Sequence, residues 1–185
     1  MDTGAILYTR YLDGGEEAVE ELVGLYNDAL IFYIDGFVRN IQDSEDIAAD
    51  TFVELIIKKS RFKNEYMLKT WLFKIARNNA INFLRKQSKR KTEQITDSEA
   101  EIADRETVEG NILRDERSRQ LHGAMGAMHE EYRDVLSLIY FFNMSYEEAA
   151  AVLGKNLKQV TNLVYRAKQT LKSTLEKGGF VYENA

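Results

Sequence analysis

Apolar side chains recur every three or four residues along most of this chain, and this spacing constrains the fold more than any other feature. A half-buried strand would instead alternate apolar and polar residues with a period of two, whereas a period near 3.6 is that of an amphipathic helix. Proline, which interrupts helices, is absent from all 185 residues. We therefore predict an all-α fold.

The apolar stripes predict three helices in the first half of the chain. The first covers residues 17–41, the second has Asp43 as its N-cap, and the third runs from about Leu68 to Lys86. The apolar stripe of the third helix consists of Leu68, Leu72, Ile75, Ala76 and Phe83.

Periodicity fades after these helices and returns near residue 115. The intervening stretch is rich in Glu, Asp, Ser and Thr, a composition typical of a linker. We predict two small helical domains, an N-terminal helical bundle over residues 1–88 and a C-terminal domain over residues 115–185, joined by an acidic flexible linker over residues 89–114.

Charge is distributed very unevenly along the sequence. The net charge of −5 argues against nucleic acid when taken alone, because neutralisation of phosphates by Lys and Arg supplies most non-specific affinity. Residues 58–91, however, contain twelve basic residues and one acidic residue, whereas residues 1–57 contain two basic and thirteen acidic residues. A local charge of +11 indicates a nucleic-acid-binding surface, the alternative being a solvated basic helix face.

Residues 146–160 have the spacing of a helix-turn-helix. Ala150 is small where the two helices cross, Gly154 can adopt the positive φ of the turn, and Val160 anchors the second helix. An ordinary αα-hairpin inside a bundle would share this apolar spacing. The side chains on the opposite face of the second helix can donate to phosphates and base edges in a major groove. They are Lys158, Gln159, Thr161, Asn162, Tyr165 and Arg166.

The reactive side chains argue against an enzyme. Cysteine is absent, which excludes disulfides and thiolate metal sites, and no glycine-rich phosphate loop occurs. The two histidines, His122 and His129, are predicted to share one helix face without a carboxylate cluster, so we interpret them as surface or packing residues. We expect no catalytic residue, no cofactor and no metal. With no signal-peptide pattern and no membrane-spanning stretch, we expect a cytoplasmic protein without membrane contact of its own.

Taken together, these segments resemble a sigma factor of the extracytoplasmic-function (ECF) type, the small alternative initiation subunits of bacterial RNA polymerase. The resemblance covers nearly the whole chain and depends on four motifs in the same order. These are Asp13-Gly14-Gly15-Glu16-Glu17-Ala18, Asp43-Ser44-Glu45-Asp46-Ile47 with Thr51-Phe52, Trp71-Leu72-Phe73-Lys74-Ile75-Ala76-Arg77-Asn78, and Tyr165-Arg166-Ala167-Lys168.

The resemblance implies that the N-terminal domain opens the minus-ten promoter element with its third helix and the preceding loop. Asn78 and Asn82 would then hydrogen-bond bases, and cations beside them would hold phosphates. Trp71 lies at the border of the apolar face, where a core-packing role is equally compatible. The implied minus-ten residues are Arg61, Phe62, Lys63, Asn64, Trp71, Lys74, Arg77, Asn78, Asn82 and Arg85.

The resemblance also implies protein partners. The second helix would bind the clamp helices of the largest subunit of core RNA polymerase, while the C-terminal domain reads the minus-thirty-five element of promoter DNA and touches the polymerase flap. The linker would thread the polymerase interior or serve as a tether, and an anti-sigma factor would hold the protein inactive. The remaining alternatives are a stand-alone helix-turn-helix regulator that binds an operator and a pure interaction protein. The implied polymerase-binding residues are Asp43, Asp46, Asp50 and Phe52.

Overall fold

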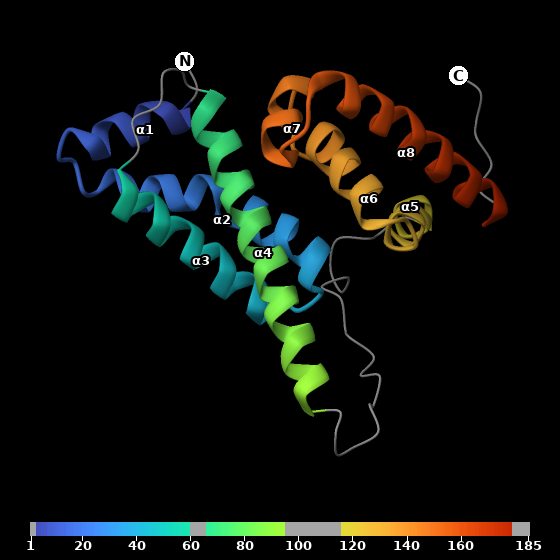
Figure 1. Cartoon of the computed structure of the whole chain (residues 1–185). Coiled ribbons are helices and arrows are strands. Elements are labelled where there is room, and N and C mark those ends of the chain that lie inside the picture. Colours follow the sequence, from blue (N-terminus) through green and yellow to red (C-terminus); the bar gives the residue numbers. More distant parts are fainter. Residues whose placement is uncertain (1–2, 60–65, 95–115, 179–185) are drawn as a thin grey trace. The chain divides into compact units, whose positions relative to one another are not determined.

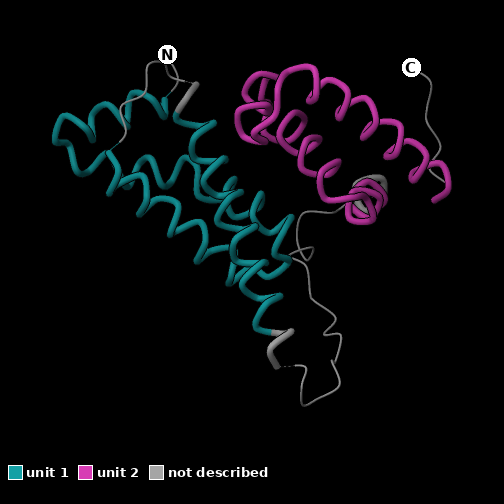
Figure 2. The backbone as a smooth tube through the Cα atoms, viewed as in Figure 1, with its two compact units in different colours: residues 1–108 teal, residues 109–185 magenta. Residues whose placement is uncertain are grey.

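The computed structural model describes residues 3–59, 66–94 and 116–178, and every regular element within these ranges is helical (Figure 1). The all-α prediction is thereby confirmed for the described part of the chain. The chain divides into two compact units, residues 1–108 and residues 109–185 (Figure 2). In order, the elements are α1 (Thr3–Leu12), α2 (Ala18–Val38), α3 (Ile41–Lys58), α4 (Tyr66–Gln94), α5 (Glu116–Gly126), α6 (Glu130–Leu136), the π-helical turn η1 (Ser137–Phe141), α7 (Tyr146–Leu153) and α8 (Leu157–Lys177).

Helix α2 is central to the first unit, where it packs against α1, α3 and α4 (Figure 1). The rings of Tyr33 on α2 and Phe73 on α4 lie 5.1 Å apart, centroid to centroid. Burial of each large apolar side chain stabilises the fold by about 1.5–3 kcal/mol. The largest fully buried side chains described in this core are Leu22, Leu30, Ile34, Val38, Leu55, Leu68, Leu72 and Phe73.

Helix α1 was not predicted from the sequence. It contributes a buried stripe of Gly4, Leu7, Tyr8 and Tyr11 to the first unit. The Tyr11 hydroxyl donates to the Ile56 carbonyl on α3 at 3.3 Å. At ten residues, α1 is too short to be stable alone, so packing on the bundle, which local sequence does not reveal, fixes it as a helix.

The second predicted helix begins earlier than expected, because its N-cap is Asn40. The Asn40 side-chain oxygen accepts a hydrogen bond from the Asp43 N–H at 3.0 Å. The prediction of Asp43 as the cap is therefore wrong: Asp43 lies in the first turn, where its negative charge suits the positive end of the helix dipole.

Helix α4 extends eight residues beyond its predicted end at Lys86. Ala80 is its last buried residue, and beyond Leu84 nearly every described side chain is exposed. Figure 1 shows this end of α4 passing beyond the neighbouring helices of its unit. Gln, Lys and Arg favour helix without any need for an apolar partner. Loss of the apolar stripe therefore marks the end of packing, and the helix itself continues.

In the second unit, α8 packs against α5, α6 and α7. Ala150 and Val160 are buried, and Gly154 has φ 66° between α7 and α8, so the predicted helix-turn-helix is confirmed. Its two helices begin with reciprocal capping boxes, formed by Ser145 with Glu148 and by Asn156 with Gln159.

The two histidines do not share a helix, contrary to the sequence prediction. His122 lies on α5, which ends at Gly126, whereas the His129 side chain caps α6 by accepting from the Glu131 N–H at 3.3 Å. Among the described residues, no group of three or more His, Cys, Asp or Glu is arranged to hold a metal ion. No described helix has both the length and the apolar character needed to cross a bilayer.

Candidate nucleic-acid interface

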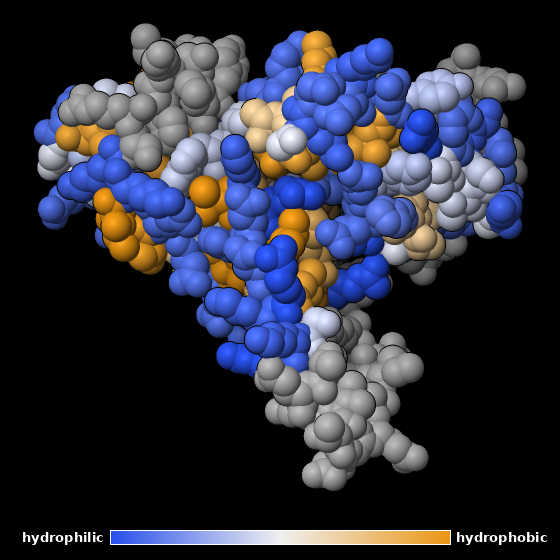
Figure 3. Space-filling view, viewed as in Figure 1, coloured by the Kyte–Doolittle hydropathy of each residue, from blue (hydrophilic) through white to orange (hydrophobic). Residues whose placement is uncertain are grey.

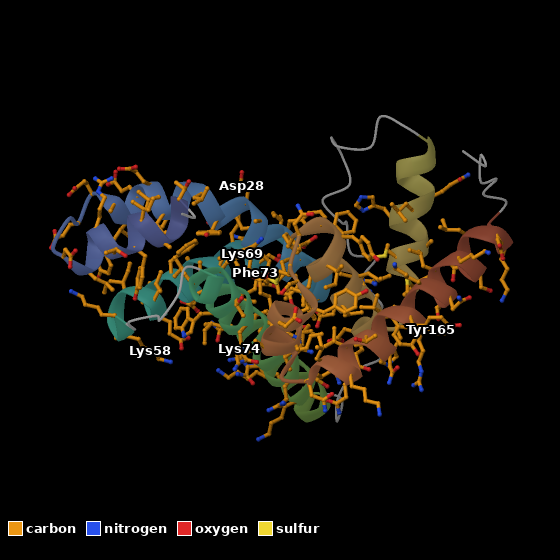
Figure 4. All side chains as sticks on the ribbon, turned by 90° about the horizontal axis from the view of Figure 1, so that it is seen from above. Asp28, Lys58, Lys69, Phe73, Lys74 and Tyr165 are labelled. Carbon is orange, nitrogen blue, oxygen red and sulfur yellow. The ribbon has the colours of Figure 1, made fainter. Side chains whose placement is uncertain are left out.

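Helix α8 presents one polar face to solvent. The helix is held on its other side by buried residues at helical spacing, among them Val160, Leu163, Val164 and Ala167. All six residues predicted for major-groove contact lie on the solvent face and are exposed. Tyr165 is the most prominent, with 66% of its surface exposed, and it projects away from α8 (Figure 4). The structure therefore brings these six side chains together on one helix face.

Gln159 has two tasks on this face. Its side-chain oxygen accepts from the Asn156 N–H at 2.9 Å, while the Asn156 oxygen accepts from the Gln159 N–H at 2.9 Å. Since the oxygen takes part in the cap and Gln159 is exposed, its side-chain NH₂ is the donor that this residue can offer to an external acceptor. Thr161 is similarly engaged, because its hydroxyl donates to the Leu157 carbonyl at 2.9 Å.

A cation–aromatic contact lies at the border of the α8 face. The Lys168 ammonium is 5.0 Å from the centroid of the Tyr140 ring on η1. A hydrogen bond to the Tyr140 side chain raises the pKa of Lys168, which further favours the charged form of this lysine. Lys168 was identified in the sequence as part of a motif, but its partner is 28 residues away and is brought beside it only in the folded unit.

The solvent face of α4 carries amides between cations. Lys74, Asn78, Asn82 and Arg85 recur at steps of three and four residues and are all exposed. Lys74 projects from the helix in Figure 4. Hydrogen-bonding amides flanked by positive charge are suited to bases beside a phosphate backbone.

Two further predicted residues, Arg77 and Trp71, are half-buried beside this face. Their position at the edge of the packed side of α4 is compatible with both packing and DNA contact. Arg61, Phe62, Lys63 and Asn64 lie outside the described residues.

The exposed face of α3 combines acidic and apolar side chains. Asp46 and Asp50 are exposed and Asp43 is half-buried, whereas Phe52 is only 5% exposed and packs in the core. We therefore remove Phe52 from the predicted contact surface, because a buried ring cannot meet a partner without unfolding the bundle.

Two exposed apolar residues of α3, which were not predicted from the sequence, are better placed for contact with a partner than the buried Phe52. Val53 and Ile57 are 51% and 75% exposed and continue the line of Asp46 and Asp50 at helical spacing. Figure 3 shows apolar atoms gathered over α3 on the face in view. The sequence could have revealed them, because both are apolar and lie on the side of this helix opposite its predicted apolar stripe.

Comparisons with known proteins match both units. Residues 22–90 match the family described as Sigma-70 region 2, and residues 118–171 match Sigma-70, region 4. RNA polymerase sigma factor YlaC of Bacillus subtilis is 27% identical over 162 residues, covering 87% of this chain and 94% of the relative. RNA polymerase sigma-H factor of Pseudomonas aeruginosa is 28% identical over 178 residues, covering 92% of each chain. ECF RNA polymerase sigma factor SigM of Bacillus subtilis is 25% identical over 160 residues, covering 86% of this chain and 96% of the relative.

Solved structures share the fold. The sigma factor RpoE in complex with the anti-sigma factor NepR from Bartonella quintana has a TM-score of 0.66 and 23% identity, covering 85% of this chain and 96% of the other. CnrH in complex with the cytosolic domain of CnrY also has a TM-score of 0.66 and 23% identity, covering 95% of this chain and 99% of the other.

Proposed function

Since this chain belongs to the sigma-70 family as a sigma factor of the ECF type, we propose that it binds core RNA polymerase and directs promoter recognition, strand opening and transcription initiation. The observation that carries this proposal is the pair of exposed amides on α4, Asn78 and Asn82, set among cations within the segment that matches region 2. The proposed domains are residues 1–88 for polymerase and minus-ten binding, residues 89–114 as linker, and residues 115–185 for minus-thirty-five binding.

The α4 face supports strand opening by offering groups that an extruded base needs. A base that leaves the stack costs a few kcal/mol, which new hydrogen bonds and a pocket must offset. Asn78 and Asn82 supply the hydrogen bonds, while Lys74, Arg77 and Arg85 hold the backbone. The predicted loop residues Arg61, Phe62, Lys63 and Asn64 would complete this surface, with Trp71 at its edge.

The α8 face supports duplex recognition at the minus-thirty-five element. A recognition helix reads base edges with its first turns and holds phosphates with flanking cations. Gln159 and Asn162 are placed to read bases, Lys158 and Arg166 to contact phosphates, and Tyr165 and Thr161 to fill the groove between them.

The α3 face supports binding to the clamp helices of the largest polymerase subunit. Asp46 and Asp50, with Asp43 beside them, offer negative charge, and Val53 and Ile57 add an apolar centre of the kind that protein interfaces bury. The second unit would also touch the polymerase flap. Because the structural neighbour RpoE is in complex with the anti-sigma factor NepR, we include an anti-sigma factor among the partners of this chain.

This proposal places the protein in the cytoplasm, where transcription occurs, and assigns it no catalytic reaction of its own. The rival function is a regulator that binds an operator without polymerase. It does not account for the match to region 2 or for the cationic face of α4.

The test is run-off transcription with purified core polymerase and promoter fragments from the genome that encodes this chain. We expect transcripts only when the chain is added, starting at a fixed distance from a common pair of sequence elements. If no fragment gives a transcript while the chain alone retards specific fragments in gels, the regulator function replaces the sigma function.

A further inference from the structure

A lysine on α8 and a tyrosine on η1 form a contact that the proposed surfaces do not use. The Lys168 ammonium lies 5.0 Å from the centroid of the Tyr140 ring and is hydrogen-bonded to the Tyr140 side chain. Both residues are exposed, Tyr140 with 50% of its surface. We call these two residues the Lys168–Tyr140 pair.

The π-helical turn places Tyr140 at the surface beside α8. The Phe142 N–H donates to the Ser137 carbonyl at 3.1 Å, which is the i to i+5 bond of a π-helix. Leu138 of this turn is buried, whereas Tyr140 is exposed. Such turns are rare and occur frequently at functional sites. The backbone of η1 therefore displays an aromatic ring at the border of the α8 face.

Tyr140 restrains the Lys168 side chain without cancelling its charge. Lys172, one turn further along α8, is instead paired with the Glu176 carboxylate at 3.8 Å. A carboxylate neutralises the lysine that it holds, whereas a phenol is uncharged at neutral pH and its ring attracts a cation. Lys168 forms no ion pair with any carboxylate in the described part of the second unit. Its ammonium is therefore held in place and remains available to an anion.

The hydrogen-bond donors of the pair suit a phosphate. An ammonium has three N–H donors, and one of them is used on the Tyr140 oxygen. The other two, together with the Tyr140 O–H, are left for an external acceptor. A site that combines donors with one positive charge matches the oxygens of a phosphodiester.

Lys168 lies on the side of α8 that carries residues of the proposed minus-thirty-five surface. Thr161, Tyr165 and Lys168 follow one another at steps of four and three residues, so they share one side of the helix. At a rise of 1.5 Å per residue, Lys168 lies about 9 Å beyond Asn162 along the helix axis. The pair is thus placed to meet the DNA backbone outside the base-reading turns.

We propose that Tyr140 is a positioning residue for DNA binding, because it holds Lys168 ready for a backbone phosphate that flanks the minus-thirty-five element. This inference rests on the proposed function and brings η1, which lies outside the helix-turn-helix, into DNA recognition. A side chain that is restrained before binding loses less conformational entropy when it binds. The carboxylates of an acidic protein are a weaker match, since the pair adjoins the side chains proposed to read bases.

The test measures how core polymerase carrying the full chain binds a duplex promoter. The promoter is first selected from a random library with the unaltered holoenzyme. Tyr140→Leu removes the ring, Tyr140→Phe keeps the ring but removes the hydroxyl, and Lys168→Gln removes the charge. The matched control is Phe141→Leu, which removes another exposed ring of the same turn, one that lies 6.2 Å from the His122 ring.

We expect Lys168→Gln to weaken promoter binding by about fivefold and to lower the slope of log affinity against log salt by about 0.9, the value for one phosphate. Tyr140→Leu should weaken binding by about threefold, within the contribution of one restrained side chain. Tyr140→Phe should weaken it less, and Phe141→Leu should leave it unchanged. Lys168→Arg, which keeps both the charge and the contact with the ring, should retain the affinity.

A double variant separates positioning from a general structural role. In a chain that already carries Lys168→Gln, Tyr140→Leu should have no further effect on DNA binding, because no cation remains to be positioned. A residue that only stabilises the second unit would weaken binding equally in both backgrounds. This comparison holds even if Tyr140→Leu lowers the stability of the unit.

A scan with methylphosphonate linkages identifies the phosphate, because each linkage removes the charge of one phosphate in the probe. At one position that flanks the minus-thirty-five element, the unaltered protein should lose affinity. Lys168→Gln and Tyr140→Leu should lose nothing more at that position.

Undiminished binding by Tyr140→Leu, or an equal loss with and without Lys168→Gln, would overturn the proposal. So would a scan without any position at which the variants and the unaltered protein bind alike. Weaker capture of core polymerase by Tyr140→Leu would reveal an acidic protein partner instead and would also overturn it. Failure of the unaltered holoenzyme to select any promoter would contradict the proposed function itself, and this inference with it.

Discussion

Gln159 shows how one side chain can serve both folding and recognition. Its oxygen completes the cap at the start of α8, and the residue is exposed on the proposed minus-thirty-five surface. The paired contact with adenine uses both the oxygen and the NH₂, so the Gln159 oxygen would have to accept a second hydrogen bond while it holds the cap. A single contact from the NH₂ to an acceptor edge, such as that of guanine, leaves the cap unchanged, whereas Asn162 has no role in the cap.

Gln159→Glu should separate these two tasks. The carboxylate of Glu keeps an acceptor for the Asn156 N–H. We therefore expect the free energy of unfolding of the second unit to change by less than about 0.5 kcal/mol. Loss of the NH₂ and the added negative charge should weaken binding of a minus-thirty-five duplex by about tenfold or more, a loss of about 1–3 kcal/mol. Gln159→Ala, which removes the cap as well, should lower both stability and binding. A stable Glu variant with unchanged affinity would remove Gln159 from the recognition surface.

Asp35 makes the stability of the first unit depend on pH. Burial raises the pKa of Asp35, against the opposing effects of the Ser44 hydrogen bond, the Asn40 backbone hydrogen bond and the Arg39 charge. Above the ordinary pKa of aspartate the unfolded chain releases a proton that the folded chain still holds. The Asp35 contribution to the free energy of unfolding must therefore fall as pH rises through the folded-state pKa.

Asp35→Asn removes this titration. Denaturant unfolding from about pH 4 upward should show a smaller fall of the free energy of unfolding with rising pH in the variant than in the unaltered chain. Asp28→Asn, an exposed neutral substitution on the same helix, is the control and should keep the original pH dependence. Parallel curves for all three proteins would contradict the assignment.

Individual residues were predictable where one local rule decides their position. Gly154 adopts the positive φ that its place in the helix-turn-helix demands, and the polar face of α8 follows from helical spacing. Phe52 and His129 were misjudged because tertiary burial and the break after α5 decide their roles. Val53 and Ile57 were missed because an exposed apolar residue is distinguished from a core residue only by what packs around it.

At the scale of elements, close packing of α1 against α2 explains why this short segment is held as a helix. A Cβ added at Gly4 would lie within 2.7 Å of a ring carbon of Tyr26 and would overlap its hydroxyl. The glycine lets α1 approach α2 directly. Any separation of the two helices at this point should weaken the docking of an element that is too short to be stable alone.

Gly4→Ala should therefore destabilise the first unit by about 1–3 kcal/mol through overpacking, despite the better helix propensity of alanine. Gly24→Ala is the matched control, because α2 leaves open space around that position and the substitution should stabilise by about 0.5–1 kcal/mol. Chemical denaturation of both variants measures the two changes. Stabilisation by Gly4→Ala would show that α1 is not held against Tyr26.

Element boundaries were predictable where a cap or an apolar stripe marks them. The turn between α7 and α8 was located correctly, whereas the N-cap of α3 was assigned three residues late and the end of α4 eight residues early. The sequence contains Asn40 but does not show that the chain enters α3 there in extended conformation. The end of α4 was missed because helix propensity continues after its apolar packing has ended.

At the scale of the whole molecule, opposite charges occupy different segments of one chain. The first 57 residues have a net charge of −11, whereas residues 58–91 have a net charge of +11. In the free protein the acidic segment should oppose DNA binding, and polymerase binding to α3 would neutralise some of this negative charge. The free chain should therefore bind promoter DNA much more weakly than the holoenzyme does.

Asp46→Asn combined with Asp50→Asn should weaken binding to core polymerase and strengthen binding to DNA. We expect capture of core polymerase to weaken by about tenfold, a change of about 1.4 kcal/mol, while the free chain binds duplex DNA slightly more tightly at low salt. Glu16→Gln with Glu20→Gln removes the same charge elsewhere and should strengthen DNA binding without affecting polymerase. Unchanged polymerase capture by the α3 variant would remove these aspartates from the interface.

The largely exposed end of α4, residues 85–90, also has a consequence for how ionic strength acts on this protein. Arg85 and Lys89, like Lys86 and Arg90, stand one helical turn apart and repel each other, and such like-charge pairs weaken an isolated helix. Added electrolyte relieves this repulsion, yet it also competes with the helix for phosphate. Added salt should therefore stabilise the helical conformation of residues 85–90 while it weakens the contact proposed between Arg85 and DNA phosphates, so the helix should persist at salt concentrations that release the DNA.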